Sequence, residues 1–430
     1  MYKVWLLLLT ALLFFCSCAK NNDTSAPQIN ITSPLENQLF QVGDTVQLIA
    51  GICDDSKLNH VSFRIVNSDF VSATPAITIY PENNCTEINH GIAISDMMLE
   101  SGTYYVMVTA FDGTNTTNGY RKIGINAVEK RLSFILVLTK NDDQVTVHKI
   151  DSLNAVSEVK TIFSDYCGSA VSSDARQFYI GGRFTSGVSV FSLDNWQPQW
   201  QVPVVVNPPF PYFEAIDVHN MQLFVSFREG RFAIYDHAGN IIASRLVENG
   251  EFPKAFLPFK DYLITFETSP DGMQKHLLAY FVPSMAVYKK IFVNYDILKI
   301  FPCNAEECLL FCNSGNLGVV KLFSLSTGAV TDKYVFPEGA FDGVACIDGS
   351  QYLLISGNEI WYFSYSQKGF TLWATAVNPR CLMYEQTEGC FYFAENQHQV
   401  RKNRLSPQEN LGTYTFQDTI INILPVYNRD

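Results

Sequence analysis

Seven six-residue segments recur in the second part of the chain: VTVHKI from Val145, VSVFSL from Val188, FAIYDH from Phe232, LLAYFV from Leu277, VKLFSL from Val320, IWYFSY from Ile360 and VRKNRL from Val400. Their starts are 43, 44, 45, 43, 40 and 40 residues apart, and their first and third positions are nearly always apolar. A fixed period near 40 residues built from short strands is typical of a β-propeller, in which each repeat forms one four-stranded blade. The sequence therefore predicts an all-β protein.

Each repeat also contains strand-like stretches on both sides of its marker segment. An innermost strand is expected ahead of six of them, at Ser169–Ser173, Phe213–Val218, Phe252–Pro258, Ile297–Phe301, Phe341–Ile347 and Pro379–Tyr384. The first repeat has no such strand, whereas the strand-like stretch from Thr419 to Val426 has no repeat of its own. We expect this stretch to pair into the first blade and close a seven-bladed propeller over residues 129–430. A six-bladed ring is the alternative, because the marker from Val400 is the most degenerate.

The preceding residues, 27–128, predict a separate β-sandwich. Short alternating strands with turn residues between them are expected at 27–34, 43–51, 61–66, 76–80, 91–95, 103–111 and 120–127. Seven or so short strands in about 100 residues are the pattern of an immunoglobulin-like sandwich.

The first 18 residues carry an export pattern. Lys3 precedes a short apolar run from Val4 to Phe15, and Ser17-Cys18 follows. This arrangement resembles the lipobox of bacterial lipoproteins, with Phe15 at a place where Leu is usual. The resemblance implies that residues 1–18 are a lipoprotein signal segment, that Cys18 is lipidated, and that residues 19–26 are a tether to a membrane. An ordinary cleaved signal peptide is the alternative.

Two further stretches carry resemblances. Residues 102–113, GTYYVMVTAFDG, resemble the penultimate strand of bacterial immunoglobulin-like domains of the fibronectin and PKD kind, with Tyr104 as the corner tyrosine. The turn at Ser326-Thr327-Gly328 resembles propellers with WD40, quinoprotein and surface-layer (YVTN) repeats. Together these features resemble Gram-negative cell-envelope lipoproteins that combine the two modules. The resemblance implies an outer-membrane location, on the periplasmic or the surface face, and it brings no cofactor because only turn residues match.

Charge and cysteines limit the function further. A formal net charge of −12 argues against nucleic acid as a partner, since binding to its backbone needs clusters of Lys and Arg. Cys381 and Cys390 are expected to face each other across one hairpin, and Cys303 and Cys308 across another, with buried free thiols as the alternative that we favour. The cysteine and histidine spacings predict no metal site.

We expect the binding residues in the loops around the propeller's central channel, on the face where the innermost strands begin. Aromatic rings there could stack on a sugar or a peptide, and polar groups could fix its orientation. The candidates are Tyr166, Arg183, Phe210, Tyr212, Phe213, Arg228, Arg231, Phe252, Phe341 and Asp342. The alternative is that Tyr212, Phe252 and Phe341 fill the gaps between blades. The tryptophans, Trp196, Trp200, Trp361 and Trp373, are expected to pack between blades.

The catalytic motifs of common hydrolases and nucleotide-binding enzymes are missing from the sequence. The favoured function is therefore a membrane-anchored, non-catalytic binding or scaffold protein whose partner is a glycan or an envelope protein. The alternative is a propeller-type glycan lyase or hydrolase, which would need carboxylates converging over the channel. The acids that could serve it are Asp165, Glu214, Asp271 and Asp342.

Overall fold

The computed structural model describes residues 25–68, 70, 72–96, 99–204, 211–219, 221–282, 284–304 and 306–428. Two of the predicted functional residues, Cys18 and Phe210, lie outside these ranges. The chain divides into two compact units, one that ends at Glu129 and one from Lys130 to Asn428, and each is described by itself. Both units consist of β-strands, and the described part of the second unit also contains one short 3-10 helix, η1 (Glu248–Gly250), between β19 and β20.

The first unit is the predicted sandwich of two sheets. A three-stranded sheet has the order β1-β3-β6, and a five-stranded sheet has the order β2-β8-β7-β4-β5. The strands are β1 (Gln28–Ser33), β2 (Gln38–Gln41), β3 (Thr45–Cys53), β4 (His60–Asn67), β5 (Ile77–Ile79), β6 (Cys85–Ala93), β7 (Gly102–Phe111) and β8 (Thr116–Asn126). The sequence pattern missed β2, and it placed the start of β6 six residues too late because the first half of that strand is polar.

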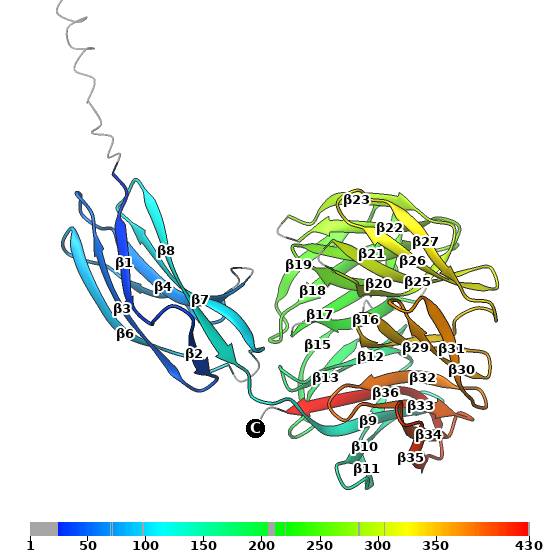
Figure 1. The fold of residues 1–430 in the computed structure, drawn as a ribbon. Coiled ribbons are helices and arrows are strands. Elements are labelled where there is room, and N and C mark those ends of the chain that lie inside the picture. Colours follow the sequence, from blue (N-terminus) through cyan, green and yellow to red (C-terminus); the bar gives the residue numbers. More distant parts are fainter. Residues whose placement is uncertain are drawn as a thin grey trace, which may run out of the picture. The chain divides into compact units, whose positions relative to one another are not determined.

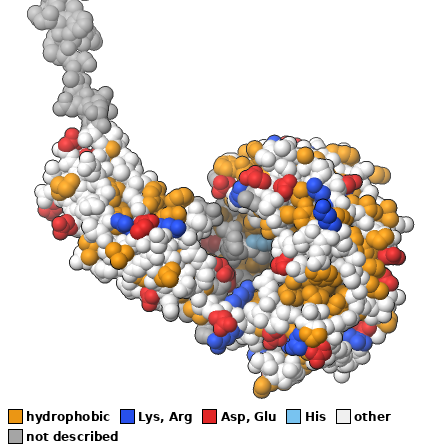
Figure 2. All heavy atoms as spheres, in the orientation of Figure 1, with side chains coloured by type: hydrophobic (Ala, Val, Ile, Leu, Met, Phe, Trp, Pro, Cys, Tyr) orange, Lys and Arg blue, Asp and Glu red, His pale blue; other side chains and the backbone are white. Residues whose placement is uncertain are grey.

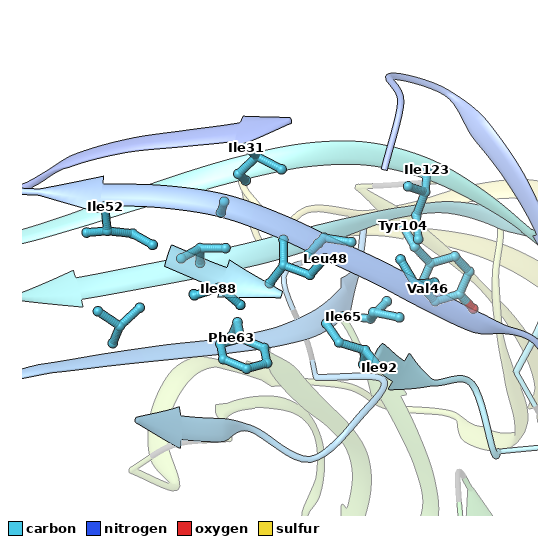
Figure 3. Packing of buried hydrophobic residues seen from close by; sticks show 14 of the residues in the cluster. Ile31, Val46, Leu48, Ile52, Phe63, Ile65, Ile88, Ile92, Tyr104 and Ile123 are labelled. Atoms are coloured by element: carbon cyan, nitrogen blue, oxygen red, sulfur yellow. The ribbon is translucent and has the colours of Figure 1, made fainter. Parts of the chain in front are cut away.

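Strict alternation explains why these segments form a sandwich. In β7 every second residue from Tyr104 to Ala110 points into the core, and the residues between them point outward. Figure 3 shows the inward residues of both sheets meeting, with Val46 and Leu48 of β3 near Tyr104. The Tyr104 hydroxyl donates a hydrogen bond to the Glu100 carbonyl at 2.9 Å, which confirms the predicted corner tyrosine.

The cysteine pairing differs from the two hairpin pairs considered from the sequence. Cys53 and Cys85, which face each other in the register of β3 and β6, form a disulfide. Both hairpin pairs are wrong: all four cysteines are free thiols. Strand register is the reason, because Cys308 lies opposite Pro302 and Cys390 lies opposite Glu385. The favoured alternative of free thiols is confirmed for these four.

The second unit contains seven four-stranded sheets, which are the blades of the propeller. The marker segment of each repeat forms the third strand of its blade, as the period indicated. Blade 1 contains β9 (Arg131–Asn141), β10 (Gln144–Asp151), β11 (Val156–Phe163) and β36 (Thr419–Asn428). Blade 2 contains β12 (Tyr166–Ser172), β13 (Gln177–Gly182), β14 (Val188–Ser192) and β15 (Pro198–Val202), and blade 3 contains β16 (Phe213–His219), β17 (Gln222–Phe227), β18 (Arg231–Tyr235) and β19 (Ile241–Leu246).

The remaining blades repeat this order. Blade 4 contains β20 (Phe252–Phe259), β21 (Tyr262–Thr268), β22 (Lys275–Phe281) and β23 (Ala286–Phe292), and blade 5 contains β24 (Asp296–Pro302), β25 (Glu307–Ser314), β26 (Leu317–Ser324) and β27 (Val330–Val335). Blade 6 contains β28 (Gly343–Asp348), β29 (Gln351–Ser356), β30 (Glu359–Ser364) and β31 (Gly369–Thr375), and blade 7 contains β32 (Arg380–Glu385), β33 (Cys390–Glu395), β34 (Gln399–Arg404) and β35 (Glu409–Thr415).

The C-terminal strand closes the ring. β36 is the innermost strand of blade 1 and pairs antiparallel with β9, so that Ile423 faces Val137 and Val426 faces Phe134. Figure 1 shows the two strands side by side, although they are the last and the first of the unit. This pairing confirms the predicted closure, and the sheets confirm seven blades rather than six.

Neighbouring blades pack face to face. The second strand of each blade lies between two other blades, which explains why β13 and β33 are buried at every position. Among the described residues, seven clusters of buried side chains fill the seven interfaces between blades. The tryptophans pack there as predicted: Trp200 lies 6.0 Å from Tyr235, and Trp373 lies 4.7 Å from Phe391, measured between ring centroids.

Candidate functional site

The seven innermost strands surround an open channel of about 720 Å³. Many of its lining residues are small or apolar, among them Ala215, Ala255 and Ala345. Its Asp, His and Lys side chains lie on three adjacent blades: Asp217 and His219 on β16, Lys254 on β20 and Lys299 on β24. Lys254 is the third of eight residues in β20, so it is nearer to the face where the innermost strands begin, which we call the strand-start face. Lys299 is the middle residue of the seven in β24 and lies halfway along the channel.

The acid and the imidazole in the channel interact with each other. The Asp217 carboxylate lies 3.3 Å from His219 Nε2. Burial alone would raise the pKa of Asp217, but the His219 ring, the charge of Lys299 and the Val218 N–H together hold it below its ordinary value. Asp217 is therefore ionised at neutral pH.

The channel lysines form no close ion pair within the described residues, although the charge of Lys299 acts on Asp217. The propeller lysines that form ion pairs are Lys260, Lys275, Lys290, Lys321 and Lys402. In the part of the chain that the structure describes, Lys254 and Lys299 form none, and both are exposed. Two cations and one anion thus line the same channel, which favours an anionic group there. Neither lysine is among the binding residues predicted from the sequence, because nothing in an alternating strand marks which of its residues faces the axis.

Tyr212 and Phe213, two of the predicted binding residues, are buried at the interface between blades 2 and 3. Their backbone N–H groups both donate to the Arg183 carbonyl, at 2.6 and 3.4 Å. The Tyr212 ring packs edge-on against Phe213 and Phe227, with centroids 4.8 and 5.4 Å apart. These rings hold the start of β16 in place and are not presented to solvent. Arg183 itself is exposed.

Two arginines each lie over a buried aromatic ring in this region. Arg231 lies 3.7 Å from the centroid of Phe227 and pairs with Glu229 at 2.9 Å. Arg228 lies 4.9 Å from the centroid of the buried Phe252 and 3.5 Å from the Glu214 carboxylate. The structure therefore brings six of the predicted residues together at the start of blades 3 and 4, but as arginines stacked on buried rings rather than as exposed aromatics.

The other predicted residues lie on other blades. Phe341 is buried between blades 5 and 6, and its backbone N–H and C=O both bond the Asn313 side chain at 2.8 Å. Its ring covers Gly318 so closely that a Cβ there would lie 2.7 Å from it. The exposed Asp342 accepts the Gly357 N–H at 2.8 Å. Tyr166 shares a hydrogen bond of 2.9 Å with Ser169, which Asn422 of β36 also contacts.

The four acids considered for catalysis each have a local partner. Asp165 accepts the N–H groups of residues 184–186, and Asp271 accepts the Met273 N–H at 2.9 Å. Although partial burial opposes it, the backbone N–H groups lower the pKa of Asp165. Glu214 and Asp342 are held by the contacts described above. These carboxylates shape loops of the strand-start face.

A buried acid cluster lies beneath that face in blade 4, and the sequence analysis missed it. Glu251 and Glu267 are both fully buried, and His276 Nδ1 lies 2.7 Å from the Glu251 carboxylate. Burial above all, together with the charge of Glu251, raises the pKa of Glu267 to about 7, although hydrogen bonds from Tyr280 and Thr265 oppose the shift. The cluster does not line the channel.

The described residues contain no group of three or more His, Cys, Asp or Glu side chains arranged to hold a metal ion. None of their helices has the length and apolar character needed to cross a bilayer.

No family model matches the chain, and no curated protein matches it. Several solved structures are similar over the propeller. BamB from Moraxella catarrhalis is 9% identical with a TM-score of 0.43, covering 68% of this chain and 93% of that one. The Dos1 propeller is 11% identical (TM-score 0.45; 68% and 87%), and a chain of a nidogen–laminin complex is 10% identical (TM-score 0.42; 69% and 98%). The likeness extends to the β-propeller fold alone.

Proposed function

We propose that this chain is a non-catalytic binding protein whose propeller holds an anionic group of a glycan or protein partner inside its channel. The observation that carries the proposal is the pair of unpaired, exposed ammonium groups of Lys254 and Lys299 on adjacent blades of an open channel. An ammonium group binds a carboxylate or a phosphate as a point charge, and in a recess it is screened less than on an open surface.

The surrounding strand-start face supplies further polar contacts. Arg183 is exposed there, whereas Arg228 and Arg231 are already engaged by Glu214 and Glu229. A partner would therefore meet Arg183 first and the channel lysines next. The buried rings beneath these arginines keep the surface rigid, which lowers the entropic cost of binding.

The enzymatic alternative has less support. A glycan hydrolase or lyase acts through carboxylates that are free to reach one sugar ring. Asp165 and Asp271 are instead committed to backbone N–H groups, and Glu214 to an arginine. The buried Glu251 and Glu267 do not reach the channel.

Membrane attachment through Cys18 belongs to the same proposal. Its support is the Ser17-Cys18 pattern after a short apolar segment. The proposed location is the envelope of a Gram-negative bacterium, on either face of the outer membrane. Expression with a radiolabelled fatty acid tests this part. We expect label in the wild-type chain and none in Cys18→Ser; label that persists in the variant would contradict lipidation at this residue.

Arrays of glycans and of acidic peptides test the binding function. We expect binding by the wild-type chain that is lost in the variant Lys254→Gln/Lys299→Gln. The matched control is Lys333→Gln/Lys368→Gln, which removes the same charge from exposed positions outside the channel lining. Equal binding by both double variants would refute the channel as the site. Turnover of a bound glycan would favour the enzymatic alternative.

A further inference from the structure

The outward face of the five-stranded sheet in the first unit carries an unusual set of side chains. In β7 the residues that point away from the core are Tyr105, Met107, Thr109 and Phe111. Because successive outward residues of a strand are about 7 Å apart, this row extends over roughly 20 Å. Cross-strand partners from β4 and β8 lie on both sides of it.

Exposed aromatic residues gather at both ends of the row. At one end Phe70 stacks on Tyr105, with centroids 5.7 Å apart, and meets Tyr120 edge-on at 5.4 Å. Phe70 and Tyr120 are 56% and 44% exposed. At the other end His60 contacts Phe111 at 5.3 Å, and it also contacts Tyr80, which is 75% exposed. Single exposed aromatics are common, but two groups on one sheet face mark an interaction surface.

The middle of the face is polar. Thr109 lies between Ser62 of β4 and Asn118 of β8, and its hydroxyl donates to the Asn118 side chain at 2.7 Å. Met107 lies between Arg64 and Tyr120. The face thus alternates ring surfaces with hydroxyl, amide and guanidinium groups.

The charge of this face is opposite to that of the chain. The outward positions of β2, β4, β5, β7 and β8 hold no Asp or Glu, although the chain has a formal charge of −12. Arg64 and Lys122 are two of only four Lys and Arg residues between positions 25 and 129. Within the described residues neither forms an ion pair, whereas Arg121, on the opposite side of β8, pairs with Glu36. Figure 2 shows how scattered the charged side chains are on the visible side of the molecule.

We propose that this face, which we call the aromatic face, binds a polysaccharide that carries carboxylate groups. The C–H faces of sugar rings stack on aromatic side chains, the hydroxyl and amide groups of the middle region match sugar hydroxyls, and Arg64 and Lys122 match the carboxylates. A membrane surface fits less well, because insertion needs a continuous apolar patch and the centre of this face is polar. The site is independent of the propeller channel.

Affinity electrophoresis of the purified chain tests the proposal, with polygalacturonate in the gel as the probe and dextran as the neutral comparison. We expect retardation by polygalacturonate but not by dextran. Tyr105→Ala/Tyr120→Ala and Arg64→Gln/Lys122→Gln should each weaken binding about tenfold or more, since two ring contacts or two charge contacts are lost. Salt between about 0.05 and about 0.5 M should weaken wild-type binding but hardly affect that of the charge variant.

Matched controls separate the face from general effects. Tyr288→Ala removes a tyrosine of the propeller that is 43% exposed, close to the 44% of Tyr120, and Lys57→Gln removes an exposed cation outside these strands. Both should bind like the wild type, as should Lys254→Gln/Lys299→Gln. Tyr105→Phe/Tyr120→Phe keeps both aromatic rings and controls for misfolding of the alanine variant. It should retain binding and have an unchanged melting temperature.

Four results would overturn the proposal. They are no retardation by polygalacturonate, equal retardation by dextran, loss of binding in the Tyr288 or Lys57 control, and full binding by both face variants. Binding to phosphatidylglycerol vesicles that the face variants lose, without binding to polygalacturonate, would assign the face to a membrane surface instead.

Discussion

Replacing Glu267 with Gln should stabilise the propeller, and more so as the pH rises. The Glu267 side chain is fully buried, and its Oε1 accepts hydrogen bonds of 2.8 Å from Thr265 and Tyr280, which a glutamine oxygen can also accept. Its Oε2 has no hydrogen-bond partner among the described residues. Ionising this group costs free energy in the folded state, because the pKa is raised to about 7 by burial and by Glu251.

The sign and size of this pH effect on stability follow from the difference between the folded and unfolded pKa of Glu267. A carboxyl group whose pKa is higher in the folded state binds its proton more tightly there, so its contribution is most favourable below the unfolded pKa and is lost as the pH rises through 7. With an unfolded pKa of 4.5, the loss between pH 5 and pH 8 is about 2.5 kcal/mol. At about 2.1 cal/mol/K of unfolding entropy per residue, a propeller of roughly 300 residues would then melt about 4 °C lower at pH 8.

Thermal unfolding monitored by circular dichroism at pH 5 and pH 8 measures this difference. We expect Glu267→Gln to remove about 4 °C of the wild-type decrease, and the exposed-site control Glu338→Gln to leave it unchanged. Identical pH dependence of the wild type and Glu267→Gln would refute the reasoning. So would a variant that is less stable than the wild type at pH 8.

Three further changes test the fold. Cys85→Ser should lower the free energy of unfolding of the first unit by about 4 kcal/mol, since the disulfide closes a loop of 32 residues; a denaturation midpoint unaffected by the change would argue against that disulfide. Phe341→Ala should cost about 3–5 kcal/mol because the ring is buried between blades, and a loss below about 1 kcal/mol in urea unfolding would show that the ring is not a packing residue. Ending the chain at Asp418 removes β36 and should leave the propeller open and sensitive to limited proteolysis; protease resistance equal to the wild type would contradict closure by this strand.

The period of the marker segments was sufficient to predict the blades, because the third strand of every blade repeats one hydrophobic pattern. Closure by the C-terminal strand was also predictable, since the first repeat lacked an innermost strand and residues 419–426 were left over. Both predictions need only the local hydrophobic pattern and a count of the strands in each repeat. Strand pairing across a long separation, such as Cys53 with Cys85, depends on register, which the sequence did not reveal.

The candidate site was harder to predict for a physical reason. An aromatic residue at the start of an innermost strand is near a loop in sequence, yet the neighbouring blade covers it, as Tyr212 and Phe252 show. Arg228 and Arg231 were expected on the right face, but their ion pairs with nearby glutamates could not be inferred. Lys299 and Glu267 stand in ordinary alternating strands, and only the packing of blades decides that one faces the channel and the other is buried.

In the proposed function, the channel lysines hold an anionic group of the partner. Isothermal titration of the best array ligand into the wild type and into Lys254→Gln/Lys299→Gln tests it most directly, with Lys333→Gln/Lys368→Gln as the control. We expect the channel variant to bind at least about tenfold more weakly, because a hydrogen bond to a charged group contributes about 1.5–3 kcal/mol, and the control to match the wild type. An affinity that is the same in all three proteins would contradict the account.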